Sequence, residues 1–181
     1  RINLLNAQFV NGRQYPGMLS ASTTNSTAVA NTVTATNFNR TYVLDAGTVD
    51  TAGQVLRIQA WGSYSTTGTP TVTLRAKANT TVLLSSGALT CETDASSLGW
   101  YMECLGVARA VSLNGSLKSS GQTGVEHIYT IGPWSMKPIN NVVAQALNFT
   151  ADQQLQFSAE WSAASTSNTI TLETLLVSLY D

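Results

Sequence analysis

Strict alternation of apolar and polar side chains constrains this sequence more than any other feature. Over residues 71–78, every even position is apolar and every odd position is polar. The same period of two recurs over residues 55–60 and 154–161. Successive side chains of a β-strand point to opposite faces, so this pattern predicts strands with one buried and one solvent-facing side. The period of 3.6 that marks an amphipathic helix is nearly absent.

Turn signals divide the chain from residue 32 onward into about eight to ten such strands. Asn114-Gly115 is typical of a tight hairpin turn, and Thr67–Pro70 suits another hairpin connection. Many short strands separated by turns are typical of a two-layer β-sandwich. We therefore expect an all-β fold, an antiparallel and jelly-roll-like sandwich, in a single domain over residues 32–181.

The strand pattern also bears on one strand pairing, one irregularity and one ambiguous segment. We expect Gly87–Cys91 and Trp100–Val111 to pair as a hairpin across the turn-rich stretch between them. The apolar phase slips at Leu175-Leu176, which predicts a β-bulge there. The segment Asn141–Phe149 fits a short helix or a strand equally well.

The first 31 residues differ from the rest because they show little periodicity. Ser20–Asn31 is a run of mostly small and polar residues. We interpret residues 1–31 as an extended N-terminal arm that orders on a neighbouring subunit, and a flexible terminus remains the alternative. Aromatic side chains are favoured anchors of protein contacts. The arm residues that we expect to bind a partner are Phe9, Tyr15, Pro16 and Met18.

Charge is scarce, and its distribution excludes several classes of protein. Charged residues make up 10% of the chain and the net charge is −1, while 25 Thr, 19 Ser and 13 Asn supply most of the polarity. Nucleic-acid binding and attraction to anionic lipids both need clustered Lys and Arg, and the 9 basic residues here are scattered. No apolar run approaches the roughly 20 residues of a membrane span. We expect no nucleic-acid partner and no membrane insertion.

The two cysteines, Cys91 and Cys104, lie 13 positions apart on opposite sides of the hairpin expected between them. Cross-strand cysteines can form a disulfide where their Cβ atoms approach. The alternative is that both are small buried thiols, which is the commoner state of a free cysteine. Without a Cys-x-x-Cys pair or paired histidines, the two cysteines do not indicate a zinc site.

Catalytic and metal-binding patterns are weak. His127 is the single histidine, and its neighbour Glu126 points to the opposite face of a strand, so no nucleophile–base–carboxylate arrangement emerges. Asp45 and Asp50 come closest to a calcium loop, but a solvated loop explains them better. We therefore expect no enzymatic activity, no catalytic residues, no cofactor and no metal.

Four tryptophans could form a platform on which a sugar stacks. Trp161 falls on an apolar strand face, which favours the core. Trp61, Trp100 and Trp134 lie outside the regular alternation or beside Gly or Pro, and we expect one of them at the surface.

Part of the chain, between Ala46 and Arg109, resembles tailed-phage virion proteins with jelly-roll-like sandwich domains. The residues that carry the resemblance are Ala46-Gly47, Val55-Leu56-Arg57-Ile58, Ala60, Gly62, Val72-Thr73-Leu74-Arg75, Val82-Leu83, Gly87-Ala88-Leu89, Trp100, Glu103 and Arg109. The resemblance implies a structural component of a phage particle, and it implies no catalytic residue. Jelly-roll virion proteins commonly form cyclic trimers, so it also implies a homotrimer.

Three functions follow from this interpretation. The first is a capsid decoration, or cement, protein on the exterior of the virion, whose arm clamps neighbouring shell proteins such as the major capsid protein. The alternative is a receptor-binding module of a tail fibre, spike or head fibre that recognises a host surface glycan through aromatic and polar side chains. The third is a jelly-roll capsid protein, against which the lack of a basic arm argues.

Overall fold

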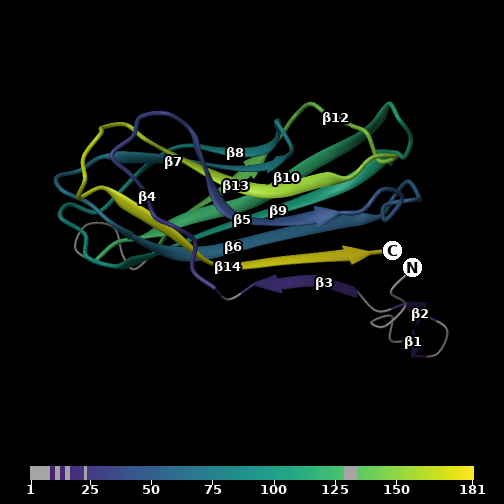
Figure 1. The fold of residues 1–181 in the computed structure, drawn as a ribbon, viewed down its shortest axis with the longest axis horizontal. Coiled ribbons are helices and arrows are strands. Elements are labelled where there is room, and N and C mark those ends of the chain that lie inside the picture. The colour runs from purple at the N-terminus through teal and green to yellow at the C-terminus, as the bar shows by residue number, and fades with distance from the viewer. Residues whose placement is uncertain (1–8, 11–12, 15–16, 23, 129–133) are drawn as a thin grey trace.

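The computed structural model describes residues 9–10, 13–14, 17–22, 24–128 and 134–181, and every regular element in them is a β-strand. Two antiparallel sheets pack face to face as a sandwich (Figure 1). The antiparallel, all-β sandwich expected from the alternation is confirmed. Ten of the described strands have six or more residues, and the other four have only two or three.

The larger sheet has eight strands, ordered β11-β10-β9-β6-β14-β3, with β12 paired to β10 and β4 paired to β14. Its members are β3 (Gly17–Ser22), β4 (Val29–Ala30), β6 (Val55–Ser65), β9 (Leu98–Ala110), β10 (Gly115–Glu126), β11 (Trp134–Asn140), β12 (Gln145–Leu147) and β14 (Thr169–Tyr180). The smaller sheet has the order β5-β13-β7-β8. Its members are β5 (Thr36–Leu44), β7 (Thr71–Ala78), β8 (Thr81–Thr90) and β13 (Gln153–Trp161). A separate two-stranded ribbon joins β1 (Phe9–Val10) to β2 (Arg13–Gln14).

The core lies between the two sheets and is built from the apolar positions of the alternation. In β7, residues 72, 74, 76 and 78 are fully buried and the odd positions are half-exposed. The largest fully buried side chains include Trp100, Trp161, Tyr64 and Phe38. Phe38 of the smaller sheet stacks on Trp100 of the larger one, with ring centroids 5.6 Å apart and an interplanar angle of 10°. This aromatic contact ties the two layers together.

The expected hairpin between Gly87–Cys91 and Trp100–Val111 is wrong. β8 pairs with β7 in the smaller sheet, whereas β9 pairs with β6 and β10 in the larger one. The segment between them therefore crosses from one layer to the other. The hairpin expected at Thr67–Pro70 is wrong for the same reason, because β6 lies in the larger sheet and β7 in the smaller one. Local alternation does not reveal this, because it shows which face of a strand is buried and not which strand lies beside it.

Two other details of the strand pattern differ from, or sharpen, the expectation. The irregularity of β14 against β6 falls between Leu172 and Thr174, so Glu173 is the extra residue rather than Leu175 or Leu176. Within Asn141–Phe149 the structure contains the short strand β12 and no helix.

Residues 17–22 and 24–30 of the expected arm run along the larger sheet, whereas β1 and β2 form the separate ribbon. β3 pairs antiparallel with β14 at the sheet edge, and Ser26 exchanges hydrogen bonds with Leu172 of the same strand. Gly17 lies opposite Leu179, so the chain enters β3 beside the C-terminal end of β14 (Figure 1).

Candidate functional site

The outer face of the larger sheet, which points away from the core, carries a group of large side chains. Trp61 of β6 lies opposite Tyr101 of β9, with ring centroids 5.2 Å apart and planes tilted by 37°. Together with Gln122 of β10 and with Trp134 and Met136 of β11, these residues line an open hollow of about 290 Å³. We call these five residues the aromatic face.

Two glycines make room for the exposed side chains of β11. A Cβ atom on Gly99 would lie 2.9 Å from Trp134 Cη2, and one on Gly124 would lie 2.7 Å from Met136 Sδ. The Trp134 ring therefore lies close over Gly99, and the Met136 thioether lies over Gly124. Both side chains stay accessible, with 42% of Trp134 and 48% of Met136 exposed to solvent.

A buried carboxylate holds the polar edge of the aromatic face. Glu103, only 6% exposed, accepts hydrogen bonds from Tyr101 Oη at 3.0 Å and from Gln122 Nε2 at 3.3 Å, both at Oε2. Its Oε1 pairs with Arg57 Nε at 2.5 Å. A carboxylate inside a protein needs partners of this kind, because burial removes its water. The network fixes Tyr101 and Gln122 beside the hollow.

Two members of this network, Tyr101 and Arg57, have raised pKa values. Burial is the main cause that raises the pKa of Tyr101, so its phenol remains a donor to Glu103. A hydrogen bond to Tyr180 is the main cause that raises the pKa of Arg57, so its guanidinium stays charged beside the carboxylate. The aromatic face is therefore a rigid surface with rings and neighbouring amide and carboxylate groups.

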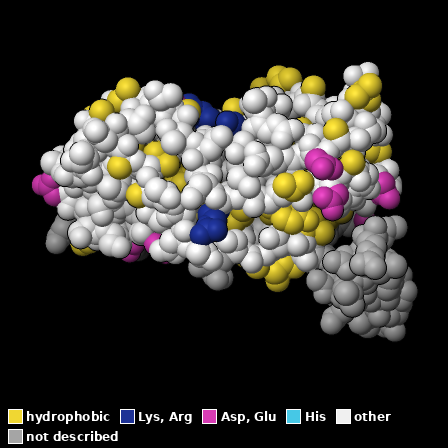
Figure 2. All heavy atoms as spheres, in the orientation of Figure 1, with side chains coloured by type: hydrophobic (Ala, Val, Ile, Leu, Met, Phe, Trp, Pro, Cys, Tyr) yellow, Lys and Arg dark blue, Asp and Glu magenta, His cyan; other side chains and the backbone are white. Residues whose placement is uncertain are grey.

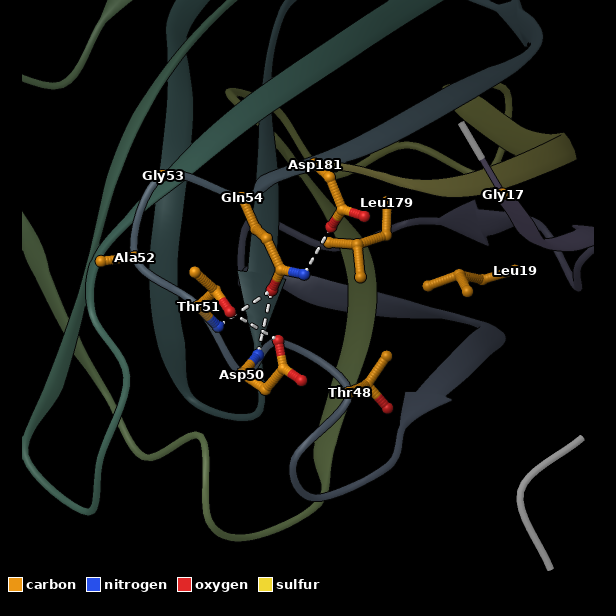
Figure 3. A pocket seen from close by; sticks show the side chains of 10 residues that line it. All are labelled: Gly17, Leu19, Thr48, Asp50, Thr51, Ala52, Gly53, Gln54, Leu179 and Asp181. Atoms are coloured by element: carbon orange, nitrogen blue, oxygen red, sulfur yellow. Dashed lines mark hydrogen bonds between the residues drawn. The ribbon is translucent and has the colours of Figure 1, made fainter. Parts of the chain in front are cut away.

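A second, larger hollow of about 600 Å³ lies where β3, the loop before β6 and the C-terminus meet (Figure 3). Its polar groups bind one another: Gln54 Oε1 accepts from the Asp50 and Thr51 amides, and Gln54 Nε2 donates to Asp181 Oδ1 at 2.7 Å. The described residues that line it include no aromatic ring. These polar groups are engaged with one another, and so this hollow fits a specific ligand less well than the aromatic face does.

Of the four residues expected to bind a partner, the structure describes Phe9 and Met18. Met18 lies in edge strand β3 with 55% of its surface exposed, and Phe9 lies in β1. Tyr15 and Pro16 lie outside the described residues. Met18 does not belong to the aromatic face.

The two cysteines are free and buried in the structure. Cys104 lies within β9 of the larger sheet, and Cys91 follows the end of β8 in the smaller one. Burial raises the pKa of each thiol to about 12, so neither is a nucleophile at neutral pH.

His127 and the acidic loop residues do not line the hollow of the aromatic face. His127 is buried with its Nδ1 3.5 Å from Glu92 Oε2, inside the protein rather than in a cleft. Asp50 accepts a hydrogen bond from Thr51 Oγ1 at 3.0 Å. Within the described ranges, no three His, Cys, Asp or Glu side chains are placed to hold a metal ion.

The three tryptophans that we placed outside the alternation differ in their exposure to solvent. Trp134 is exposed, Trp61 is half-buried and Trp100 is 1% exposed. The sequence contained a signal for Trp61: the inward phase of β6 includes residues 56, 58 and 60, which places residue 61 on the outer face. Nothing local marks Tyr101, Gln122 or Met136 as its neighbours, because they come from three other strands.

Most of the visible surface in Figure 2 is neither hydrophobic nor charged, in keeping with the Thr- and Ser-rich composition. Among the described residues, no helix is long and apolar enough to cross a membrane.

Comparisons with known proteins reveal little similarity. No protein-family model matches the sequence, and no curated protein matches it. A solved structure that resembles the fold is the CBM2 module of the evolved Dit of Lactobacillus casei BL23 phage J-1, with a TM-score of 0.35 and 7% sequence identity over 94% of this chain and 77% of that one. A similarity at this level assigns neither a family nor a function.

Proposed function

We propose that this chain is a non-enzymatic carbohydrate-binding module on the exterior of a phage particle, which attaches the particle to a glycan of the host surface. The single observation that carries the proposal is the aromatic face, where Trp61, Tyr101 and Trp134 converge beside Gln122. The placement on a virion rests on the resemblance of residues 46–109 to tailed-phage structural proteins.

The chemistry of a sugar suits this surface. A pyranose ring presents apolar C–H groups on its faces and hydroxyl groups around its rim. Tryptophan and tyrosine rings offer large apolar area and lose little conformational entropy on binding, while a few fixed polar groups provide orientation. Glu103 and its partners hold the polar edge of the aromatic face in place before any ligand arrives, which lowers the entropic cost of binding.

Glycan-array binding, followed by titration calorimetry, tests this function. We expect the wild-type chain to bind at least one class of glycan, and the double variant Trp61→Ala/Trp134→Ala to lose that binding. Val142→Ala, which removes an exposed apolar side chain outside the aromatic face, is the matched control and should bind as the wild type does. The proposal fails if no glycan binds at millimolar concentration, or if the double variant binds as well as the control.

A capsid decoration protein is the second candidate, and the position of β3 favours it. This strand forms an edge of the larger sheet, and Met18 on it is 55% exposed. A chain that precedes an edge strand can extend onto a neighbouring subunit, here a second copy in a homotrimer or the major capsid protein. In this role the arm would clamp the shell.

Occupancy of the capsid tests the second candidate. Alanine at Phe9 and Tyr15 should weaken occupancy of the head and leave the thermal unfolding of the sandwich nearly unchanged. A large loss of sandwich stability would instead show that these side chains pack on their own domain. Immunogold labelling of intact particles separates the two candidates, because label over the head supports decoration and label at the tail tip or fibres supports glycan binding.

A further inference from the structure

Two carboxylates that form no ion pair with any described residue flank the aromatic face. The first, Glu126 of β10, accepts a hydrogen bond at Oε2 from the Gly99 amide at 2.7 Å. The missing Cβ of Gly99 would lie 3.2 Å from this oxygen and 2.9 Å from Trp134 Cη2. The Glu126 carboxylate and the exposed Trp134 ring therefore converge on one point of the surface.

The second carboxylate, Glu173, lies at the bulge of β14. Its Oε1 accepts a hydrogen bond from Ser63 Oγ at 2.6 Å. Ser63 is two residues beyond Trp61 on the same outer face of β6, and it pairs in register with Gly99. The two carboxylates thus approach the aromatic face from its two sides, one from β10 and one from β14.

Among the described residues, the basic side chains on neighbouring strands bind groups other than Glu126 and Glu173. Arg57 is engaged by Glu103, Lys137 donates to the Ser86 carbonyl of the smaller sheet at 2.8 Å, and Lys118 donates to the Val142 carbonyl. Among the described residues, neither Glu126 nor Glu173 forms an ion pair. The undescribed stretch 129–133 contains no charged residue in its sequence. In the described part of the chain, Glu126 and Glu173 therefore remain unpaired carboxylates beside the hollow.

We infer that the aromatic face selects a saccharide that bears a protonated amine, that is, an amino sugar whose nitrogen is not acylated. An ammonium group beside Trp134 would gain both a cation–π contact and the attraction of Glu126. Uronic, phosphorylated or sulfated sugars would be repelled by the like charge of these carboxylates. An ionised carboxylate also has no hydrogen to donate to their anionic groups. This inference rests on the proposed function and names the class of ligand for the same surface.

Three tetrasaccharides that differ in charge test the inference by titration calorimetry. They are the β-1,4-linked tetramer of glucosamine, its fully N-acetylated form, and tetragalacturonic acid. At about pH 5.5 the amines are protonated and ordinary Glu side chains remain ionised. We expect the glucosamine tetramer to bind about tenfold more tightly than the N-acetylated form, because a partly exposed ion pair and a cation–π contact each contribute a few-fold. The acidic tetramer should not bind.

Charge-neutralising variants locate the effect. Glu126→Gln and Glu173→Gln keep the hydrogen-bond acceptor and remove the charge, so each should lower affinity for the glucosamine tetramer several-fold and weaken its dependence on salt. Glu160→Gln is the matched control, because Glu160 pairs with Arg75 on the smaller sheet. It should leave the affinity unchanged.

The outcomes separate this inference from the proposed function. Equal or tighter binding of the N-acetylated or acidic tetramer overturns the preference for an amine and leaves carbohydrate binding intact. The preference is also overturned if all three tetramers fail while the glycan array reports a neutral ligand. If the array is silent as well, both the inference and the proposed function fall.

Discussion

Replacing Trp100 by phenylalanine should destabilise the sandwich strongly while leaving its layers in place. Trp100 is 1% exposed, stacks on Phe38 and donates a hydrogen bond from Nε1 to the Thr171 carbonyl at 2.9 Å. Phenylalanine keeps an aromatic ring for the contact with Phe38 but removes the donor and part of the ring volume. Loss of the partner of this part-buried carbonyl costs about 1 kcal/mol, and the lost ring volume adds a cavity that costs about 2 kcal/mol. We expect the free energy of unfolding to fall by about 3 kcal/mol in total.

Urea denaturation and calorimetry measure this loss. For a chain of this size, a loss of about 3 kcal/mol lowers Tm by roughly 6–12 °C. Trp134→Phe is the matched control, because the same chemical change falls on a side chain that is 42% exposed, and it should change stability by less than about 0.5 kcal/mol. The reasoning is refuted if Trp100→Phe costs less than about 1 kcal/mol, or if the two variants are equally destabilised.

Three further outcomes follow from buried groups. Cys91 and Cys104 should resist iodoacetamide in the native protein at about pH 8 and react in urea, because burial holds both thiols protonated; rapid native alkylation would contradict their burial. Since burial raises each thiol pKa from 9.0 to about 12, the stabilisation is complete below about pH 9 and is lost as pH rises toward 12. Between about pH 9 and 12, each thiol should therefore lower the free energy of unfolding by about 1.4 kcal/mol per pH unit. Cys104→Ala should make the measured slope of this free energy against pH less steep. Gly121→Ala would place a Cβ 1.9 Å from the Glu103 carbonyl oxygen, so urea unfolding should show a loss of about 3 kcal/mol or more, whereas Gly17→Ala, with no atom within 4 Å, should be neutral. An equal effect of the two glycine variants would contradict the close approach of β9 and β10.

Some parts of the candidate site could have been predicted from the sequence. The phase of β6 already places Arg57 and Trp61 on the solvent side, opposite the buried Leu56 and Ile58. Treating Trp61 as an interruption of the alternation hid this, although its position continues the outward phase. Trp100 shows the opposite case, because it keeps the inward phase of β9 and belongs to the core.

The partners of these residues could not have been predicted in the same way. The expected hairpin from β8 into β9 fails because the chain changes sheet between them, and this change has no local signature. The bulge at Glu173 arises where β14 accommodates β6, two residues before the position where the apolar phase slips. Where strands are not joined by a tight turn, such as the one at Asn114-Gly115 between β9 and β10, sheet neighbours are set by long-range pairing that the adjacent residues do not reveal.

The sequence by itself determined that the chain forms strands, which face of most strands is buried, and that the surface is poor in charge. Alternation is a local property, because each side chain of a strand points opposite to the next one along the chain. Only the tertiary structure decided that Trp61, Tyr101, Trp134 and Glu126 meet, since they come from four different strands that pair across the larger sheet. The physical reason is that a site on a sheet face combines side chains from neighbouring strands, and these neighbours lie perpendicular to the strand direction, where they can be far apart in the sequence.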